Sequence, residues 1–82
     1  MKTNDIKKGT RVLLRNGWFG TMMDNLKGNT RMVDVEGYSR EIGSVYSWDI
    51  VEAYTESGDP VSVEHTDKQL AQRKMVKKLF GG

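Results

Sequence analysis

The sequence predicts a mainly β domain, a five-stranded antiparallel barrel followed by a C-terminal α-helix. Three observations lead to this fold class. Short β-rich runs separated by glycine or asparagine fill roughly the first two thirds of the chain. Five short strands joined by tight turns are well accommodated in a small barrel, which leaves few exposed sheet edges. A helix-capping motif at Thr66–Gln69 then precedes a lysine-rich segment with helical periodicity.

The first two strands are predicted on either side of an Asn16-Gly17 turn. In the preceding run, Val12 and Leu14 share one face at the period of two that a strand has. Asn-Gly between apolar runs is a strong hairpin signal, because both residues tolerate a positive φ. We expect the return strand over 18–24, followed by a longer turn at 25–29.

Three further strands complete the predicted barrel. The first alternates cleanly, with Arg31, Val33 and Val35 on one face, so Arg31 has to reach the rim or extend its charged end to water. A short polar segment later in the chain is too short for an α-helix and fits a single 3₁₀ turn. The strands are expected over 30–36, 38–45 and 50–53, with the 3₁₀ turn at 46–49.

The C-terminal third is predicted to leave the barrel through a polar connector and to end in a helix. Gly58-Asp59-Pro60 is a strong turn signature, and the next residues fit either an edge strand or coil. Thr66 at the N-cap and Gln69 three residues later have the spacing of a capping box, so we expect a helix over 68–80. The predicted organisation is a barrel over residues 1–55, a linker over 56–65 and a basic amphipathic helix over 66–80.

The predicted helix has an apolar face and a basic face. The apolar face either packs on its own barrel as a lid or pairs with a second copy, so a homo-oligomer through this helix remains open. The apolar residues are Ala71, Met75, Val76, Leu79 and Phe80, and the basic ones are Arg73, Lys74, Lys77 and Lys78, with Leu70 among them.

Length and composition indicate one small cytoplasmic domain. A chain of 82 residues leaves no room for two cores. Because it has no cysteine, it can form neither a disulfide nor a thiolate metal site, which fits a reducing compartment. Residues 1–8 lack the apolar stretch of a secretory signal, and no apolar run approaches the ~20 residues that a membrane span requires. We therefore expect no membrane partner.

The charge of the chain is unevenly distributed. Residues 1–40 carry eight Lys or Arg against four Asp or Glu. Residues 41–60 carry five acids and no Lys or Arg, and residues 61–82 carry five basic residues against two acids. This asymmetry either reflects charged partners or is an ordinary solvated surface.

The first hairpin carries a family resemblance. The segments Lys8–Leu14, Asn16-Gly17 and Gly20–Asp24 resemble the KOW pattern of SH3-like barrels, in which a basic-Gly-polar-basic-Val opening precedes a glycine hairpin. KOW modules of ribosomal proteins and transcription elongation factors bind RNA or nucleic-acid machinery. The resemblance implies an SH3-like barrel with that function. The chain departs from the pattern in its shorter hairpin loop and in Trp18 and Phe19, which stand where small or basic residues are common.

A second resemblance covers a longer stretch. Residues 5–51 resemble small uncharacterised proteins of tailed phages, most clearly around 41–46 and 48–50. This resemblance implies no known activity. If the chain is phage-encoded, the expected location is the cytoplasm of the host.

No residue pattern points to catalysis. His65 has neither a cysteine nor a second histidine to join it, so a metal site would need three further ligands from scattered acids. Asp34 and Glu36 share a strand face, but nothing suggests a pocket around them. Gly17 to Gly20 lacks the spacing and the following helix of a phosphate-binding loop. We therefore expect neither an enzyme, nor a metal site, nor a cofactor.

The leading functional hypothesis is a module that binds nucleic acid or a nucleic-acid-processing protein. Basic residues from one sheet region would follow the phosphates, and the indole of Trp18 would stack on a base. The expected nucleic-acid-binding residues are Arg11, Arg15, Trp18, Lys27, Arg31 and Arg40.

The alternative hypothesis is a small inhibitor or adaptor that binds a host protein through an acidic and aromatic face. An acidic face repels phosphate, so the two hypotheses use opposite sides of the barrel. For Trp48 we favour a third role, as a plug at the end of the barrel, because so small a core needs large apolar residues. The expected protein-binding residues are Glu41, Tyr46, Trp48, Asp49 and Glu52.

Overall fold

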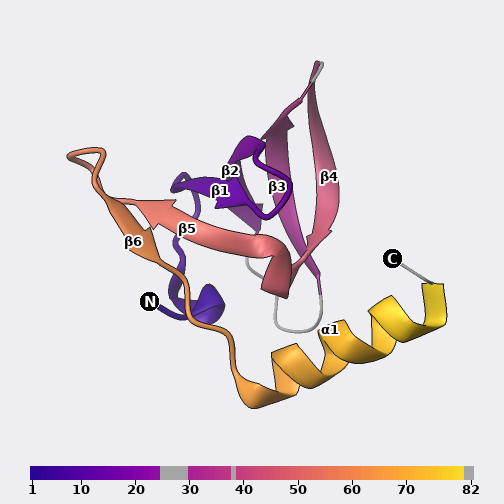
Figure 1. The fold of residues 1–82 in the computed structure, drawn as a ribbon. Coiled ribbons are helices and arrows are strands. Elements are labelled where there is room, and N and C mark those ends of the chain that lie inside the picture. The colour runs from indigo at the N-terminus through magenta and orange to yellow at the C-terminus, as the bar shows by residue number, and fades with distance from the viewer. Residues whose placement is uncertain (25–29, 38, 81–82) are drawn as a thin grey trace.

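A computed structural model describes residues 1–24, 30–37 and 39–80 of the chain (Figure 1). One antiparallel sheet of six strands forms the body of the molecule, and a C-terminal helix extends from it. The strand order is β4-β3-β2-β1-β5-β6. The strands are β1 (Arg11–Leu14), β2 (Phe19–Asp24), β3 (Thr30–Glu36), β4 (Arg40–Tyr46), β5 (Ile50–Tyr54) and β6 (Pro60–Ser62).

Two 3₁₀ turns and one α-helix complete the fold. The turn η1 (Thr3–Asp5) precedes β1, and the turn η2 (Ser47–Asp49) joins β4 to β5 at the place where the sequence predicts it. The helix α1 (Asp67–Phe80) follows β6. None of the helices in the described residues has the length and apolar character that crossing a membrane requires.

The prediction of a mainly β fold with a C-terminal helix is confirmed, whereas the five-stranded barrel is not: the six strands form one open sheet. A sixth strand, β6, pairs with β5 through Ala53–Val61 and Tyr54–Pro60. The predicted linker over 56–65 therefore contains a strand, and it also contains the buried side chain of Val63. The sheet stays open between β4 and β6, because η2 takes the chain straight from β4 to β5, which pairs with β1 instead.

The first hairpin forms around the predicted Asn16-Gly17 turn. Gly17 has a φ of +92°, a conformation that side-chain-bearing residues rarely adopt. The amide of Leu14 donates to the carbonyl of Trp18 at 2.8 Å, and the side-chain oxygen of Asn16 accepts from the Trp18 amide at 3.0 Å. The local sequence therefore fixes the register of β1 on β2, with Val12 opposite Gly20.

The core lies on the concave face of the sheet. The alternation predicted for β1 places Val12 and Leu14 there, and Val33 of β3 joins them. Trp48 of η2 is only 2% exposed, which confirms its predicted place inside the molecule. The buried apolar residues are Ile6, Val12, Leu14, Met22, Val33, Trp48, Ile50, Ala53 and Val63.

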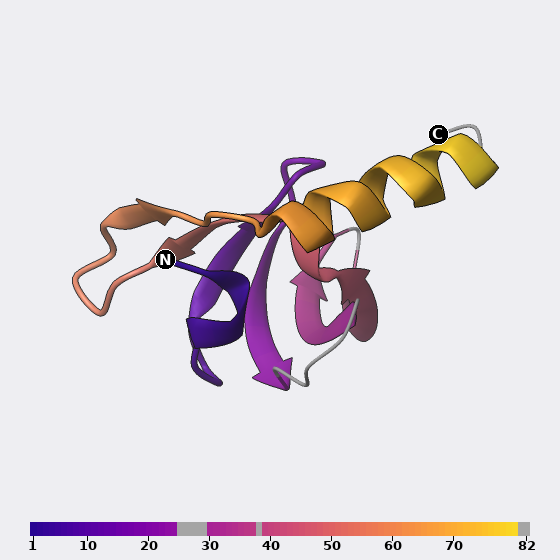
Figure 2. The ribbon, with the colours of Figure 1, turned by 90° about the horizontal axis from the view of Figure 1, so that it is seen from below.

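The helix begins with the predicted capping box. The Gln69 amide donates to the hydroxyl of Thr66 at 3.1 Å, and the Thr66 amide donates to the side-chain oxygen of Gln69 at 2.9 Å. Beyond this first turn α1 runs outward from the sheet (Figures 1 and 2). It packs chiefly against η2 and leaves Met75 and Leu79 exposed, so it does not form the lid over the barrel that we considered.

Gly20 of β2 is the position at which the sheet tolerates no side chain. A Cβ there would lie 2.5 Å from Cγ1 of Val33 and 3.1 Å from the carbonyl oxygen of Asp34. Gly43 of β4 is the opposite case, because a Cβ there would have no atom within 4 Å. The close approach of β3 to β2 therefore depends on the missing side chain of Gly20.

We predict that Gly20→Ala lowers the free energy of unfolding by about 1–3 kcal/mol, because the new methyl group forces β3 away from β2. The matched control, Gly43→Ala, has room for the same methyl group and should be neutral or stabilising by up to about 1 kcal/mol. Urea denaturation of both variants measures the difference. Equal stability of the two variants would contradict the close packing at Gly20.

Candidate functional site

A groove of about 620 Å³ opens at one end of the sheet, between the end of β4 and the turn from β1 to β2. Three segments that lie far apart in the sequence form its walls: the end of β1 with its turn, the start of β3, and the stretch from the end of β4 into η2. We call it the β4 groove. Its lining residues are Leu14, Arg15, Asn16, Thr30, Ser44, Val45, Tyr46 and Asp49.

A stacked aromatic pair lies at the β4 groove. The rings of Tyr46 and Trp48 are 4.7 Å apart with an interplanar angle of 9°. Trp48 is buried, whereas Tyr46 keeps 37% of its surface exposed. Because Trp48 supports the phenol ring from behind, Tyr46 presents a fixed aromatic surface to a ligand without a large loss of side-chain freedom.

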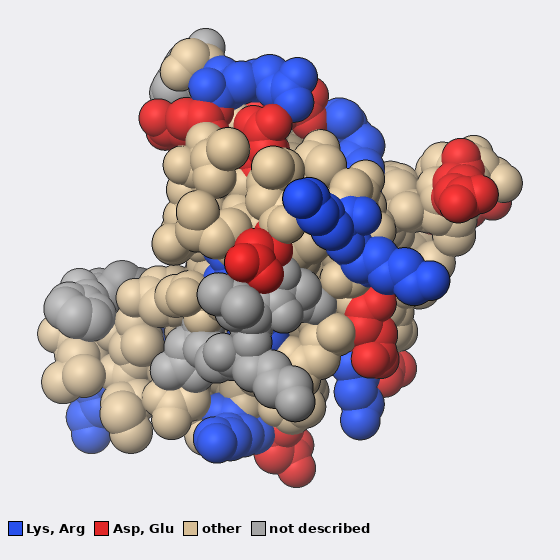
Figure 3. Space-filling model, turned by 180° about the vertical axis from the view of Figure 1, so that it is seen from behind, with Lys and Arg blue, Asp and Glu red and all other residues tan. Residues whose placement is uncertain are grey.

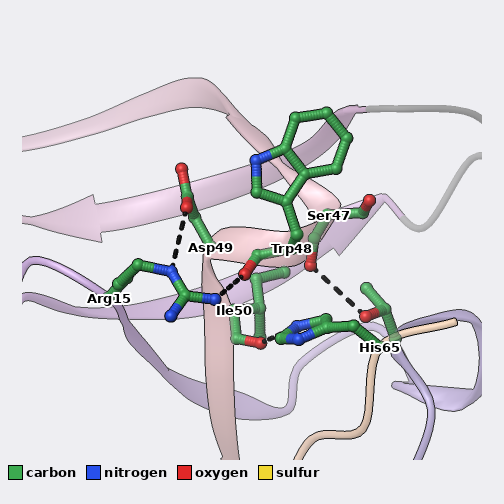
Figure 4. A network of polar contacts seen from close by, with 7 residues as sticks. Arg15, Ser47, Trp48, Asp49, Ile50 and His65 are labelled. Carbon is green, nitrogen blue, oxygen red and sulfur yellow. Dashed lines mark hydrogen bonds and ion pairs between the residues drawn. The ribbon is translucent and has the colours of Figure 1, made fainter. Parts of the chain in front are cut away.

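Arg15 ties the hairpin turn to η2 on one side of the groove (Figure 4). Its Nη2 donates to the carbonyl oxygen of Trp48 at 2.6 Å, and its Nε lies 3.4 Å from the carboxylate of Asp49. The backbone amide of Arg15 also donates to the carbonyl of Asp49 at 2.7 Å. The guanidinium therefore positions η2, and it is not free to bind a phosphate.

Two more polar contacts converge on this turn from other parts of the chain. The Thr3 hydroxyl donates to the carbonyl of Ser47 at 3.3 Å, and Gln69 of α1 lies 3.5 Å from the Ser47 hydroxyl. His65 Nε2 lies 2.9 Å from the carbonyl oxygen of Ile50 (Figure 4). His65 thus has a structural contact, and the described residues contain no group of three His, Cys, Asp or Glu placed to hold a metal ion.

The predicted nucleic-acid-binding residues do not form one cationic stripe. Arg11 pairs with Glu36 at 2.9 Å and lies over the ring of Phe19, 4.7 Å from its centre. Arg40 pairs with Asp34 at 2.7 Å, and this hydrogen bond and the charge of Asp34 raise the pKa of Arg40. On the face seen in Figure 3, Lys and Arg alternate with Asp and Glu instead of gathering. Lys27 lies outside the described residues.

We expected Arg31 to reach the rim or to extend its charged end to water, but it is buried, with 2% of its surface exposed. Its guanidinium donates to the carbonyl of Thr30 at 2.9 Å and to the side-chain oxygen of Asn4. Desolvation lowers the pKa of Arg31. The sequence alternation placed Arg31 on the same face as Val33 correctly, but the N-terminal segment supplies a hydrogen-bond partner there. Its position is that of a structural residue.

Trp18 is the aromatic member of the predicted nucleic-acid-binding set and is 40% exposed. Its ring lies over Gly37, where a Cβ would come within 2.7 Å of the ring. Gly37, which follows β3, therefore covers part of the indole.

The predicted protein-binding residues are partly brought together. Tyr46 and Asp49 line the β4 groove with Trp48 behind them, and Glu41 is exposed farther along β4. Glu52 lies apart from the groove and accepts a hydrogen bond from the Tyr54 hydroxyl at 3.2 Å. Partial burial and this carboxylate raise the pKa of Tyr54.

Most of the groove lining was missed from the sequence. Each of the missed residues looked like an ordinary strand or turn residue: Leu14, Asn16, Thr30, Ser44 and Val45. These residues come together only because the first hairpin contacts η2, and no local sequence pattern predicts that contact. Only the position of Val45 beside Tyr46 offered a signal.

We predict that Arg31→Ala lowers the free energy of unfolding by about 2–3 kcal/mol, because buried hydrogen bonds to a charged group are lost. The control, Arg40→Ala, removes an exposed ion pair and should cost less than about 1 kcal/mol. Thermal and urea unfolding of both variants test this. A stable Arg31→Ala variant would mean that Arg31 is available for a ligand.

Comparisons of the chain with protein-family models, with curated proteins and with solved structures gave no match. The resemblance of Lys8–Asp24 to KOW modules therefore remains a resemblance of sequence pattern. The candidate site is defined by its own geometry: an aromatic surface at Tyr46, the Arg15–Asp49 pair and the outer edge of β4.

Proposed function

We propose that this chain is a non-enzymatic binding module that holds an extended segment of a partner protein in the β4 groove. The observation that carries the proposal is the half-exposed Tyr46 ring, supported by buried Trp48 beside an open groove. Aromatic residues of this kind are the commonest anchors in protein interfaces.

The unpaired edge of β4 favours a ligand in an extended conformation. β4 is the terminal strand of the sheet, so its outer backbone groups have no partner strand among the described residues. An extended segment can pair with such an edge and place alternate side chains in a neighbouring pocket. The β4 groove, lined by Ser44, Val45 and Tyr46 of the same strand, lies where those side chains would go.

The proposal includes an SH3-like origin for the sheet. Five consecutive antiparallel strands, a glycine turn after the first and a 3₁₀ turn before the fifth support an open version of the SH3-like barrel that the KOW resemblance implies. In this version β6 extends the sheet beyond β5. Partners of the nucleic-acid-processing class, or a host protein if the chain is phage-encoded, fit such a module.

A second candidate is nucleic-acid binding by the barrel itself. The exposed part of the Trp18 ring favours it, because bases stack on aromatic side chains. The ion pairs of Arg11 and Arg40 oppose it, since a phosphate would have to displace Glu36 and Asp34. We therefore place protein binding first.

Peptides selected from a displayed library against the folded protein test the groove. In a Trp18→Phe background, binding should change the fluorescence of Trp48, which stacks on Tyr46. Tyr46→Ala should weaken binding more than tenfold, as loss of an anchor worth about 2 kcal/mol does. The control Tyr54→Ala lies outside the groove and should bind normally.

Two results would contradict the proposal. Selected peptides that bind Tyr46→Ala and the unchanged protein equally would place their site elsewhere. Failure to select any peptide, together with oligonucleotide binding that is lost in Trp18→Ala, would favour the second candidate.

A further inference from the structure

The helix α1 is the part of the molecule with the least contact to the rest. Its first turn is held by the capping box and by Gln69 near Ser47, and its remaining length points away from the sheet (Figures 1 and 2). Met75 is 56% and Leu79 is 71% exposed. The helix therefore presents most of its circumference to solvent.

The charge of α1 is strongly positive, and no ion pair with another described residue neutralises it. The helix contains Lys68, Arg73, Lys74, Lys77 and Lys78 against the single acid Asp67. The ion pairs that the described residues form all involve arginines of the sheet or its turn, and none involves a cation of α1. The arginines of the sheet and its turn are thus already paired with carboxylates, whereas the cations of α1 make no ion pair with another described residue.

Four of these cations share one side of the helix, because residues three or four apart are neighbours on a helix surface. Lys74 lies next to Lys77 and Lys78, and Arg73 lies next to Lys77. Each neighbouring like-charge pair disfavours the isolated helix slightly, and a bound polyanion removes that repulsion. We call Arg73, Lys74, Lys77 and Lys78 the cationic face.

The repetition of charge along α1 matches a ligand with repeated negative charges. With a rise of about 1.5 Å per residue, Lys74 and Lys78 are separated by about 6 Å along the axis, close to two phosphate spacings of about 3.4 Å. Lys74, Lys77 and Lys78 are exposed, while Arg73 is half-buried. Contacts to phosphates carry no sequence information directly, so the contact would be independent of sequence.

A second copy of the chain does not fit this face, because it would bring two strongly positive helices together. A lipid surface would need a broad apolar face beside the lysines. The large apolar residues exposed on α1 are Leu70, Met75 and Leu79, and Leu70 lies among the cations, so they do not form one broad apolar face. Charge complementarity thus selects a phosphate backbone.

We propose that the cationic face of α1 binds the phosphate backbone of nucleic acid without sequence preference. This site is separate from the β4 groove and uses none of the barrel arginines. It therefore does not depend on the proposed protein-binding function.

The test uses the full-length chain and two fluorescent probes, an oligodeoxythymidine and a mixed-sequence DNA duplex, with binding followed by anisotropy between about 50 and 200 mM salt. Four phosphate contacts predict a slope of log affinity against log salt of about −3.6 on the duplex. Affinity should therefore fall about a hundredfold over this range of salt.

The double variant Lys74→Gln/Lys78→Gln should make the slope shallower by about two, so that its affinity falls only about tenfold over the same range. Lysine and glutamine have similar helix propensity, so circular dichroism should show α1 intact.

The matched control is Arg11→Gln/Arg40→Gln, which removes the same charge from residues that are already paired. This control should keep nearly the full salt slope, and Tyr46→Ala should bind both probes as the unchanged protein does. The proposal is overturned if the helix variant and the unchanged protein have equal slopes, or if the arginine control loses binding instead.

A third arm distinguishes nucleic acid from a membrane surface. Vesicles containing phosphatidylserine should bind less tightly than the oligonucleotide at equal salt, and Met75→Ser/Leu79→Ser should leave oligonucleotide binding unchanged. Stronger binding to vesicles that depends on Met75 and Leu79 would assign α1 to lipid and overturn the proposal.

Discussion

The structure depends on the three-residue turn η2, because the first hairpin, the N-terminal segment and α1 are each fastened to it. Arg15 bonds to the Trp48 carbonyl and pairs with Asp49, so the first hairpin is held there. Thr3 brings in the N-terminal segment, and Gln69 anchors the first turn of α1. Trp48 fills the space beneath, and burial of so large a ring supplies much of the driving force for these contacts. The hydrogen bonds fix how these segments are oriented around η2, and burial of the Trp48 indole makes their association favourable in free energy.

The same turn leads to the open edge of the sheet. It takes the chain from β4 into β5, which pairs with β1, so the outer edge of β4 has no partner strand among the described residues. The β4 groove lies beside this edge, between the end of β4 and the first hairpin. The groove is therefore a consequence of the topology and not of a locally unusual sequence.

Local signals in the sequence predict the elements of this fold well, and non-local contacts explain what they miss. The Asn16-Gly17 turn, the 3₁₀ turn before β5 and the Thr66–Gln69 capping box depend on neighbouring residues only, and all three are present. Arg11 and Arg40 looked like free cations because their carboxylate partners are contributed by other strands or by more distant residues. The open edge of the sheet and the lining of the groove likewise depend on contacts between segments far apart in the sequence. Strand alternation correctly put Arg31 on the inner face, but its burial depends on Asn4, far away in the sequence.

The distribution of charge bears on how the two proposed binding surfaces could coexist on so short a chain. Arg11, Arg15 and Arg40 are each matched by a carboxylate, and such exposed pairs contribute little to stability. Their main effect is to keep the surface of the sheet locally neutral, so a polyanion would gain little electrostatic free energy by binding there. The cationic face of α1 lacks this compensation, but at physiological ionic strength its attraction decays over about 8 Å. None of the cations of α1 lines the β4 groove, so under our proposal the groove selects its ligand by shape, backbone pairing and contact with Tyr46.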